Sequence, residues 1–138
     1  MYKRQAPDAP FASAKVGQGE TFVSEVDESD GSIALYKPAI AVLNNVSLDH
    51  KSLEELRELF GDFLARARIA VVNADDVESM GLCHRARRVI SFGFGPDADL
   101  SVDPSSISEG PTTIAATLID RRDGSSHCLL YTSPSPRD

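Results

Sequence analysis

The sequence feature that most limits the fold of this chain is one strongly patterned helix between two short apolar runs. Ser52-Leu-Glu-Glu55 has the form of a capping box, in which a serine and a glutamate three residues later satisfy free amides at a helix start. Apolar residues then recur at three- and four-residue spacing, which gives the helix one buried face: Leu53, Leu56, Phe60, Phe63 and Leu64. The runs at 39–43 and 69–72 flank this helix and predict a strand–helix–strand unit.

Other segments extend this unit. Further short apolar runs occupy 21–26 and 88–92, and a weaker helix is predicted over 79–87. Continuous apolar strands that alternate with crossovers are typical of a parallel sheet covered on both faces. The region from residue 21 to residue 92 is therefore predicted to form such a sheet with flanking helices.

The pattern changes after Asp97. Segments 100–102 and 112–119 are alternating or β-branched, and 120–124 has the composition of a hairpin turn. These features predict antiparallel strands. The predicted fold class is α/β, a mostly parallel sheet with flanking helices plus a small antiparallel β appendage.

The two ends of the chain differ in character from the rest. Residues 128–138 resemble the translation of a transposase-type sequencing adapter, and residues 1–5 resemble the opposite strand of the same adapter. Tyr-Lys-Arg-Gln can be written TATAAGAGACAG, and the reverse complement of that stretch, read from its second base, starts Cys-Leu-Leu. We therefore expect one partial domain at 6–127, with 1–5 and 128–138 as foreign segments excluded from fold reasoning.

Composition excludes several classes of function. The formal net charge of -7 argues against nucleic acid or an anionic membrane as a partner, because neutralising phosphates requires clustered Lys and Arg. No apolar run reaches the roughly 18 residues of a membrane span, and no basic-then-apolar leader is present. Only Cys83 lies within 6–127, so a disulfide framework is not expected. These features predict a cytoplasmic protein.

An acidic cluster follows the apolar run at 21–26. It places four carboxylates within six positions, at Glu25, Asp27, Glu28 and Asp30. Carboxylates this close repel one another, so they need open water or a cation. If the runs that begin at residues 21 and 39 are neighbouring parallel strands, their C-terminal ends meet at the sheet edge where open α/β sheets bind ligands. Glu25 and the pair Asp49-His50 are then expected to converge on a cation–phosphate site.

Less specific interpretations remain open at this point. An acidic cluster in a turn is most often a solvated loop, and Asp49-His50 can serve as entry residues of the capped helix. An EF-hand calcium loop is excluded by spacing, because taking Gly31 as its sixth residue puts Val26 at the first ligand position. The glycines at 17–20 and 93–96 lack the lysine of a phosphate loop.

The acidic cluster belongs to a longer pattern that resembles the central ATP-binding domain of the Mur ligase family. The pattern comprises Glu25 to Ser32, Ala41-Val-Leu-Asn-Asn-Val46, Asp49-His50, Asn73-Ala-Asp-Asp76 and residues 92–99. Its order and spacing are more specific than any single piece. The resemblance implies a fragment of an ATP-dependent acid–amino-acid ligase of peptidoglycan precursor synthesis. The most similar branch adds L-alanine to UDP-N-acetylmuramate through an acyl phosphate.

The resemblance also implies roles for individual residues. Glu25 and His50 match the catalytic residues that hold Mg²⁺ in the family, and Glu28 and Asn45 match substrate-binding positions. The implied cofactor is Mg²⁺, with ATP as a substrate, and the implied partners of the parent enzyme are UDP-N-acetylmuramate and L-alanine. Because Mg²⁺ prefers oxygen ligands, a histidine ligand is unusual, and His50 can act through water.

Some positions depart from the family pattern. Val26 replaces the usual alanine, Asn44 stands where threonine is common, and Lys51-Ser52 replaces leucine or methionine followed by aspartate. Asn44-Asn45 also resembles the muropeptide ligase branch, so a tripeptide ligase of cell-wall recycling is an alternative, as is a non-catalytic acidic α/β binding module. The family's Gly-Lys-Thr phosphate loop and its N- and C-terminal domains are missing, so this fragment alone is expected to be inactive.

Overall fold

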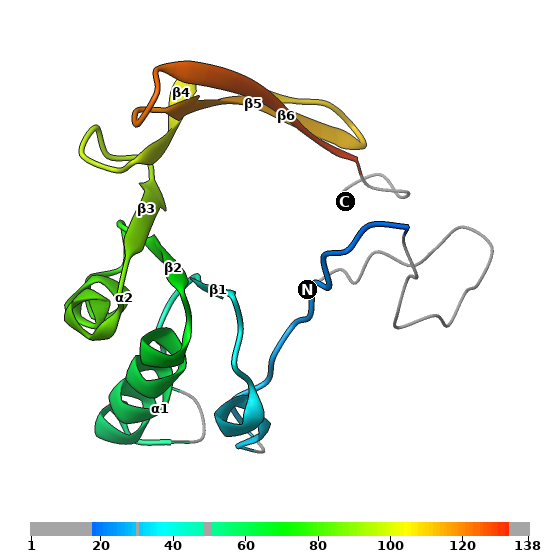
Figure 1. Cartoon of the computed structure of the whole chain (residues 1–138). Helices are drawn as coiled ribbons and strands as arrows, with labels where there is room; N and C mark the ends of the chain where they lie inside the picture. The colour runs from blue at the N-terminus through cyan, green and yellow to red at the C-terminus, as the bar shows by residue number, and fades with distance from the viewer. Residues whose placement is uncertain (1–17, 30, 49–50, 133–138) are drawn as a thin grey trace.

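The computed structural model describes residues 18–29, 31–48 and 51–132. In this part of the chain six strands form one sheet in the order β1-β2-β3-β4-β5-β6 (Figure 1). The strands are β1 (Ile40–Leu43), β2 (Ile69–Asn73), β3 (Val89–Gly93), β4 (Leu100–Glu109), β5 (Thr113–Asp120) and β6 (Ser125–Thr132). The helical elements are α1 (Leu53–Arg66), α2 (Val77–Gly81) and the short 3-10 helices η1 (Ser32–Leu35) and η2 (Cys83–Arg85).

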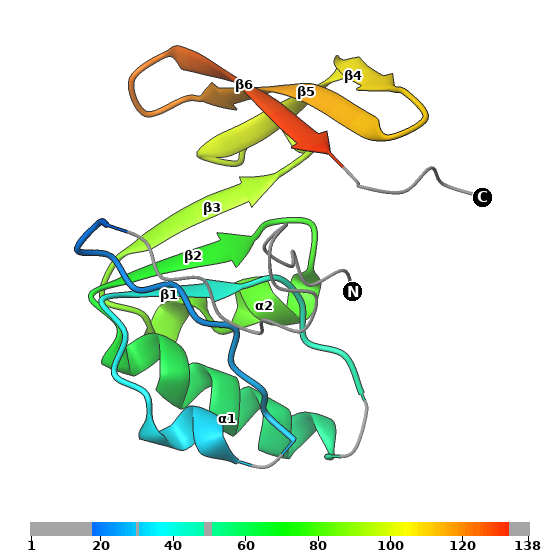
Figure 2. The same ribbon diagram turned by 90° about the vertical axis from the view of Figure 1, so that its right-hand side faces the viewer.

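The sheet has a parallel half and an antiparallel half. β1, β2, β3 and the start of β4 run parallel, whereas β4, β5 and β6 form an antiparallel meander. The two halves join through only two registered pairs, Phe92 with Leu100 and Gly93 with Ser101. Figure 2 shows the meander projecting away from the helices. The predicted α/β fold class with an antiparallel appendage is confirmed.

Helix α1 begins at the predicted capping box. The Ser52 side chain accepts a hydrogen bond from the Glu55 amide, and the Ser52 amide donates to Glu55 Oε2 at 2.9 Å. The apolar face predicted for this helix is buried or partly buried, and Leu56, Phe63 and Leu64 lie in the core. They pack with the inward side chains of β1 and β2, which are Ala41, Leu43, Ala70 and Val72.

Helices cover only one face of the parallel strands in the described residues. Leu82, which follows α2, lies in the same core cluster as the buried face of α1. On the opposite face Ile40 and Val42 of β1 are 54% and 57% exposed, and the register places Val71 beside Val42. A parallel sheet is normally covered on both sides. The expectation of two covered faces is therefore wrong for this part of the chain.

The segment 21–26 is not a strand. Residues 21–27 have no regular structure, and Phe22 and Val23 are 88% and 87% exposed. Figure 1 shows this segment running apart from β1, whose only partner among the described residues is β2. An apolar run forms a stable strand only where a neighbouring strand pairs with its backbone and another layer covers its side chains. Neither is provided here, so the predicted buried strand at 21–26 is wrong.

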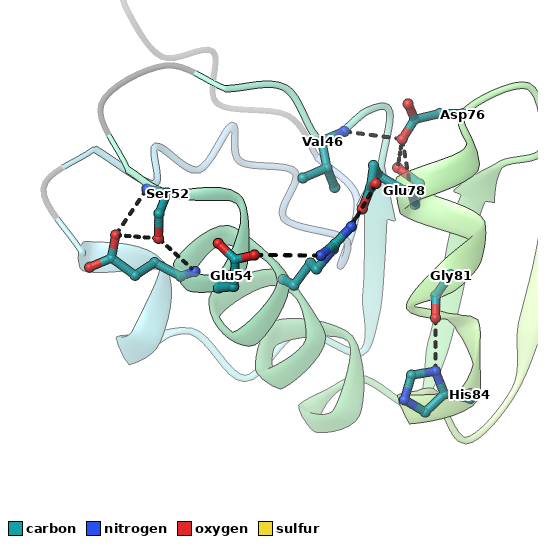
Figure 3. Close-up of polar contacts among 10 residues, drawn as sticks. Val46, Ser52, Glu54, Asp76, Glu78, Gly81 and His84 are labelled. Carbon is teal, nitrogen blue, oxygen red and sulfur yellow. Dashed lines mark hydrogen bonds and ion pairs between the residues drawn. The ribbon is translucent and has the colours of Figure 1, made fainter.

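The helix observed in place of the one predicted over 79–87 is α2, which begins two residues earlier, at Val77, and is shorter. Asp76 caps α2, which ends at Gly81, and η2 follows after Leu82. Arg57 of α1 joins the two helices, because its Nε and Nη2 atoms donate to the two carboxylate oxygens of Glu78 at 2.8 Å each. This bidentate hydrogen bond raises the pKa of Arg57 and lowers the pKa of Glu78. Figure 3 shows the pair between α1 and α2.

The hairpin turn predicted at 120–124 is confirmed. Gly124 has a φ of 77°, which favours glycine, and its amide donates to the Asp120 carbonyl. The Arg122 guanidinium hydrogen bonds to the Asp120 carboxylate and holds its pKa at about 2. β6 then continues to Thr132 and so includes residues of the segment 128–138. Strand pairing does not reveal the origin of that segment, and its assignment as foreign stays a prediction.

Two aspartates brace the edge at which the parallel strands end. Asp75 follows β2, and its Oδ2 accepts a hydrogen bond from the Phe94 amide beyond β3 at 2.8 Å. Asp76 Oδ2 accepts from the Val46 amide beyond β1 at 3.1 Å and from the Ser79 amide at 2.8 Å (Figure 3). The C-terminal ends of three strands are therefore held together by consecutive carboxylates.

Burial alone would raise the pKa of Asp76. The hydrogen bonds from the Ser79 hydroxyl and amide and from the Val46 amide outweigh burial, so the pKa is lowered from its ordinary value of 3.8. Because the folded pKa is the lower one, the stability that the carboxylate contributes is present above the unfolded value. It is lost as the pH falls through the folded value.

No helix in the described part of the chain is long and apolar enough to cross a membrane.

Substitution of Asp76 tests this brace. We expect Asp76→Ala to lower the free energy of unfolding at pH 7 by about 1–3 kcal/mol, because an N-cap and a second amide lose their acceptor. Urea denaturation at several pH values from 7 down to 3 should show this difference shrinking once the pH drops below about 4. Asp97→Ala, at an exposed position, is the control. A difference that stays constant over the whole range would contradict the proposed role of the ionised carboxylate.

Gly61 of α1 offers a second test, because a side chain there meets Arg85. An added Cβ would lie 2.6 Å from Arg85 Cδ, and Arg85 is held by Glu58 at 3.0 Å and Asp62 at 2.6 Å. Gly61→Ala forces the Arg85 side chain to move and weakens its exposed ion pairs, so we expect it to lose most of the ~1 kcal/mol by which alanine favours a helix over glycine. In an Arg85→Ala background the same change should instead stabilise, by about 1 kcal/mol.

The two backgrounds are compared by thermal or urea denaturation in a double-mutant cycle. Gly81→Ala is the matched control, because nothing lies within 4 Å of a Cβ at that position. An equal effect of Gly61→Ala with and without Arg85 would show that the two residues are not coupled.

Candidate functional site

Two members of the acidic cluster, Asp27 and Glu28, lie in a compact turn. The Ser29 amide donates to Asp27 Oδ1 at 2.8 Å, and the Gly31 amide donates to the Glu28 carbonyl at 3.3 Å. Gly31 has a φ of 75°, a conformation that side chains other than glycine rarely adopt, and it leads directly into η1. Asp27 and Glu28 thus lie in a turn with its own backbone geometry and not at the end of a strand.

Lys51 ties this turn to the start of α1. Its Nζ atom donates to the Glu28 carbonyl at 3.0 Å and to the Ser29 carbonyl at 2.9 Å. Lys51 stands between the pair Asp49-His50 and the N-cap Ser52 in the sequence. The residue that follows the predicted histidine ligand is therefore in direct contact with the turn that carries Glu28.

The predicted site residues differ in their surroundings. Glu25 is exposed on the irregular segment 21–27, Glu28 is half-buried, and Asn45 is exposed just beyond β1. The Asn45 side chain donates to Ser47 Oγ at 3.2 Å. His50 lies outside the described residues. The roles predicted for all four residues are untested by the geometry and stay predictions.

The described oxygen donors suit Mg²⁺ in kind but do not form a closed site. Among residues 18–29, 31–48 and 51–132, no three His, Cys, Asp or Glu side chains gather closely enough to hold a metal ion. Mg²⁺ is commonly held by one or two carboxylates, with water and substrate phosphates as its other ligands. A carboxylate such as that of Glu25 therefore fits part of such a site.

The residues that sequence reasoning missed are those that position the site. In the sequence, Asp76 is marked only as part of the motif at 73–76, and Lys51 only as a departure from the family pattern. The signal for Asp76 was its place between β2 and Ser79, which is the N-cap position of α2. Nothing local in the sequence indicates that Lys51 contacts carbonyls more than twenty residues away, since that contact depends on the tertiary fold.

Other chemistry-bearing side chains have structural surroundings. Cys83 is half-buried, and burial raises the pKa of its thiol, which disfavours the reactive thiolate. His84 is exposed, with Nδ1 2.8 Å from the Gly81 carbonyl (Figure 3).

Comparison with known proteins identifies the family. Residues 8–128 match the model of the Mur ligase middle domain. The chain is 42% identical over 102 residues to UDP-N-acetylmuramate–L-alanine ligase of Sulfurihydrogenibium sp. (strain YO3AOP1), covering 67% of this chain and 22% of that relative. It is 36% identical over 120 residues to the ligase of the same name from Streptomyces coelicolor, covering 78% of this chain and 26% of that relative.

A solved structure supports the same fold. The crystal structure of MurF from Acinetobacter baumannii superposes with a TM-score of 0.55 at 16% identity, covering 76% of this chain and 24% of that one. The chain thus spans about a quarter of the length of the relatives that it matches. The family model covers far more than half of its residues, and the chain therefore belongs to the Mur ligase middle-domain family.

Proposed function

We propose that this chain is part of an ATP-dependent ligase that joins L-alanine to UDP-N-acetylmuramate in peptidoglycan precursor synthesis. Support comes from the relatives of that name that match 67% and 78% of the chain. The observation that carries the proposal is the position of the acidic turn, which Lys51 holds at the entry to α1, directly after Asp49-His50 in sequence.

The proposed reaction consists mainly of positioning and charge neutralisation. The substrate carboxylate attacks the γ-phosphate of ATP, which breaks the bond to ADP and gives an acyl phosphate. The amine of alanine then adds to the acyl carbon, and the tetrahedral intermediate loses a proton and expels inorganic phosphate to leave the amide. Bound Mg²⁺ supplies neutralisation of the phosphate charge. We assign Glu25 as a carboxylate ligand and His50 as a second ligand, directly or through water. Glu28 and Asn45 are assigned to the substrate side.

The exposed face of the parallel strands is evidence that this chain is part of a larger protein. Ile40 and Val42 are exposed on the side of β1 away from α1, and aliphatic side chains on a parallel sheet are normally covered. We propose that another part of the ligase covers this face and supplies the Gly-Lys-Thr phosphate loop, which the sequence of this chain does not contain. Residues 6–127 are proposed as the native domain fragment, with 1–5 and 128–138 foreign, and the parent enzyme as cytoplasmic.

A muropeptide ligase of cell-wall recycling is the second candidate. It is favoured by Asn44-Asn45, both exposed immediately after β1. The third candidate is a non-catalytic acidic module that binds a partner through its surface. Unlike the two ligases, it does not need Glu25 as a metal ligand.

Glu25→Gln in the complete ligase that carries this domain tests the site. The change keeps the size of the side chain and removes its charge, so we expect ligase activity at millimolar Mg²⁺ to fall at least about 100-fold. Circular dichroism should report an unchanged fold, because Glu25 is exposed. Glu20→Gln, at an exposed position five residues earlier, is the matched control. Wild-type activity in Glu25→Gln would remove this residue from the site and favour the binding module.

The isolated chain is expected to be catalytically silent. Purified protein of this sequence should release no phosphate from ATP above background in the presence of Mg²⁺, because it contains no phosphate loop. A coupled phosphate assay, with and without excess EDTA, measures this directly. Turnover that depends on the metal would overturn the proposal that the phosphate-binding loop belongs to another part of the parent enzyme.

A further inference from the structure

The described geometry assigns Lys51 a role that depends on the proposed function. We propose that Lys51 is a positioning residue, which fixes the turn at Glu28 and Ser29, three residues beyond Glu25 in the sequence, relative to the start of α1. It acts through the backbone, because its ammonium group donates to the carbonyls of Glu28 and Ser29 at 3.0 and 2.9 Å.

The backbone beside Lys51 is fixed by the start of α1. Ser52, the next residue, is the N-cap of α1 and exchanges hydrogen bonds with Glu55 in the capping box. The side chain of Lys51 is half-buried, so its stem is confined by neighbouring atoms. A fixed cation of this kind positions two carbonyls more firmly than a freely exposed lysine would.

The charge of Lys51 suits the turn that it contacts. The segment between Glu25 and Asp30 carries four carboxylates, whose mutual repulsion favours an open chain. An ammonium group on the carbonyls of this segment offsets that repulsion and accepts no hydrogen bond itself. Methionine has a similar length and no charge, so it is the natural replacement for Lys51 in a test of this contact.

A second, independent contact holds the other end of the same segment. Ile33 of η1 is buried in the core at 2% exposure, and Arg66 at the end of α1 donates to the Ala34 carbonyl at 2.8 Å. Segment 28–35 is thus attached to α1 at both ends, by Lys51 and by Arg66. Removing the Lys51 side chain should therefore loosen the acidic turn while η1 stays packed on α1. A local effect of this kind can be told apart from a loss of the whole fold.

Hydrogen exchange on the full chain provides the first test. In Lys51→Met we expect the Ser29 and Gly31 amides to exchange about tenfold faster, because a charge-assisted contact to the turn is lost. Amides in the middle of α1 should be unaffected. Lys51→Arg, which retains two donors for the carbonyls, should restore the protection. Arg66→Met is the matched control and should affect the amides of η1 and not Ser29.

Magnesium dependence of the complete ligase provides the second test. Lys51→Met is expected to raise the Mg²⁺ concentration needed for half-maximal activity about tenfold, with Lys51→Arg close to wild type. Unchanged exchange at Ser29 and Gly31 in Lys51→Met, or the same magnesium requirement as wild type, would overturn the proposal. If Glu25→Gln is fully active, the proposed function fails, whereas the exchange result still decides whether Lys51 fixes the turn.

Discussion

The packing of α1 on the parallel strands is the constraint on which the rest of the described structure depends. Leu64 is fully buried between the helix and β1–β2, and the capping box fixes where the helix begins. Four further contacts then radiate from this helix or its entry. Lys51 donates hydrogen bonds to the acidic turn, and Arg57 donates to Glu78 of α2. The missing side chain of Gly61 leaves room for Arg85, and Arg66 donates to a carbonyl of η1. A single amphipathic helix thus sets the positions of segments that have little regular structure of their own.

Much of this architecture follows from local sequence pattern. The capping box, the spacing of Leu56, Phe63 and Leu64, and the glycine of the turn at 120–124 each specify a local conformation that tertiary contacts then reinforce. The run at 21–26 has an equally apolar pattern and yet forms no strand. An apolar pattern indicates only that a segment favours burial. A stable strand also needs a neighbouring strand and a covering layer, and neither is a property of the segment itself.

The candidate site is predictable to a different degree. Residue types alone indicate only an acidic cluster, and the resemblance to the family marks Glu25, Glu28 and Asn45 as candidates without giving their surroundings. The braces are long-range contacts. Asp76 meets the amide of Val46, thirty residues away, and Lys51 meets carbonyls beyond twenty residues. A hydrogen bond between a side chain and a backbone group leaves no partner residue type in the sequence, so no sequence pattern reveals it.

The bare face of β1 also affects how this chain behaves in solution. β1 pairs only with β2 in the described residues, and no strand of that part of the chain covers its outer edge beside the exposed side chains of Ile40 and Val42. Two copies can associate through such an edge, and the net charge of -7 opposes their approach at neutral pH. That charge vanishes near the isoelectric point of about 4.9. Mildly acidic solutions and high salt therefore favour aggregation of this chain, and electrostatic repulsion between copies sets its solubility.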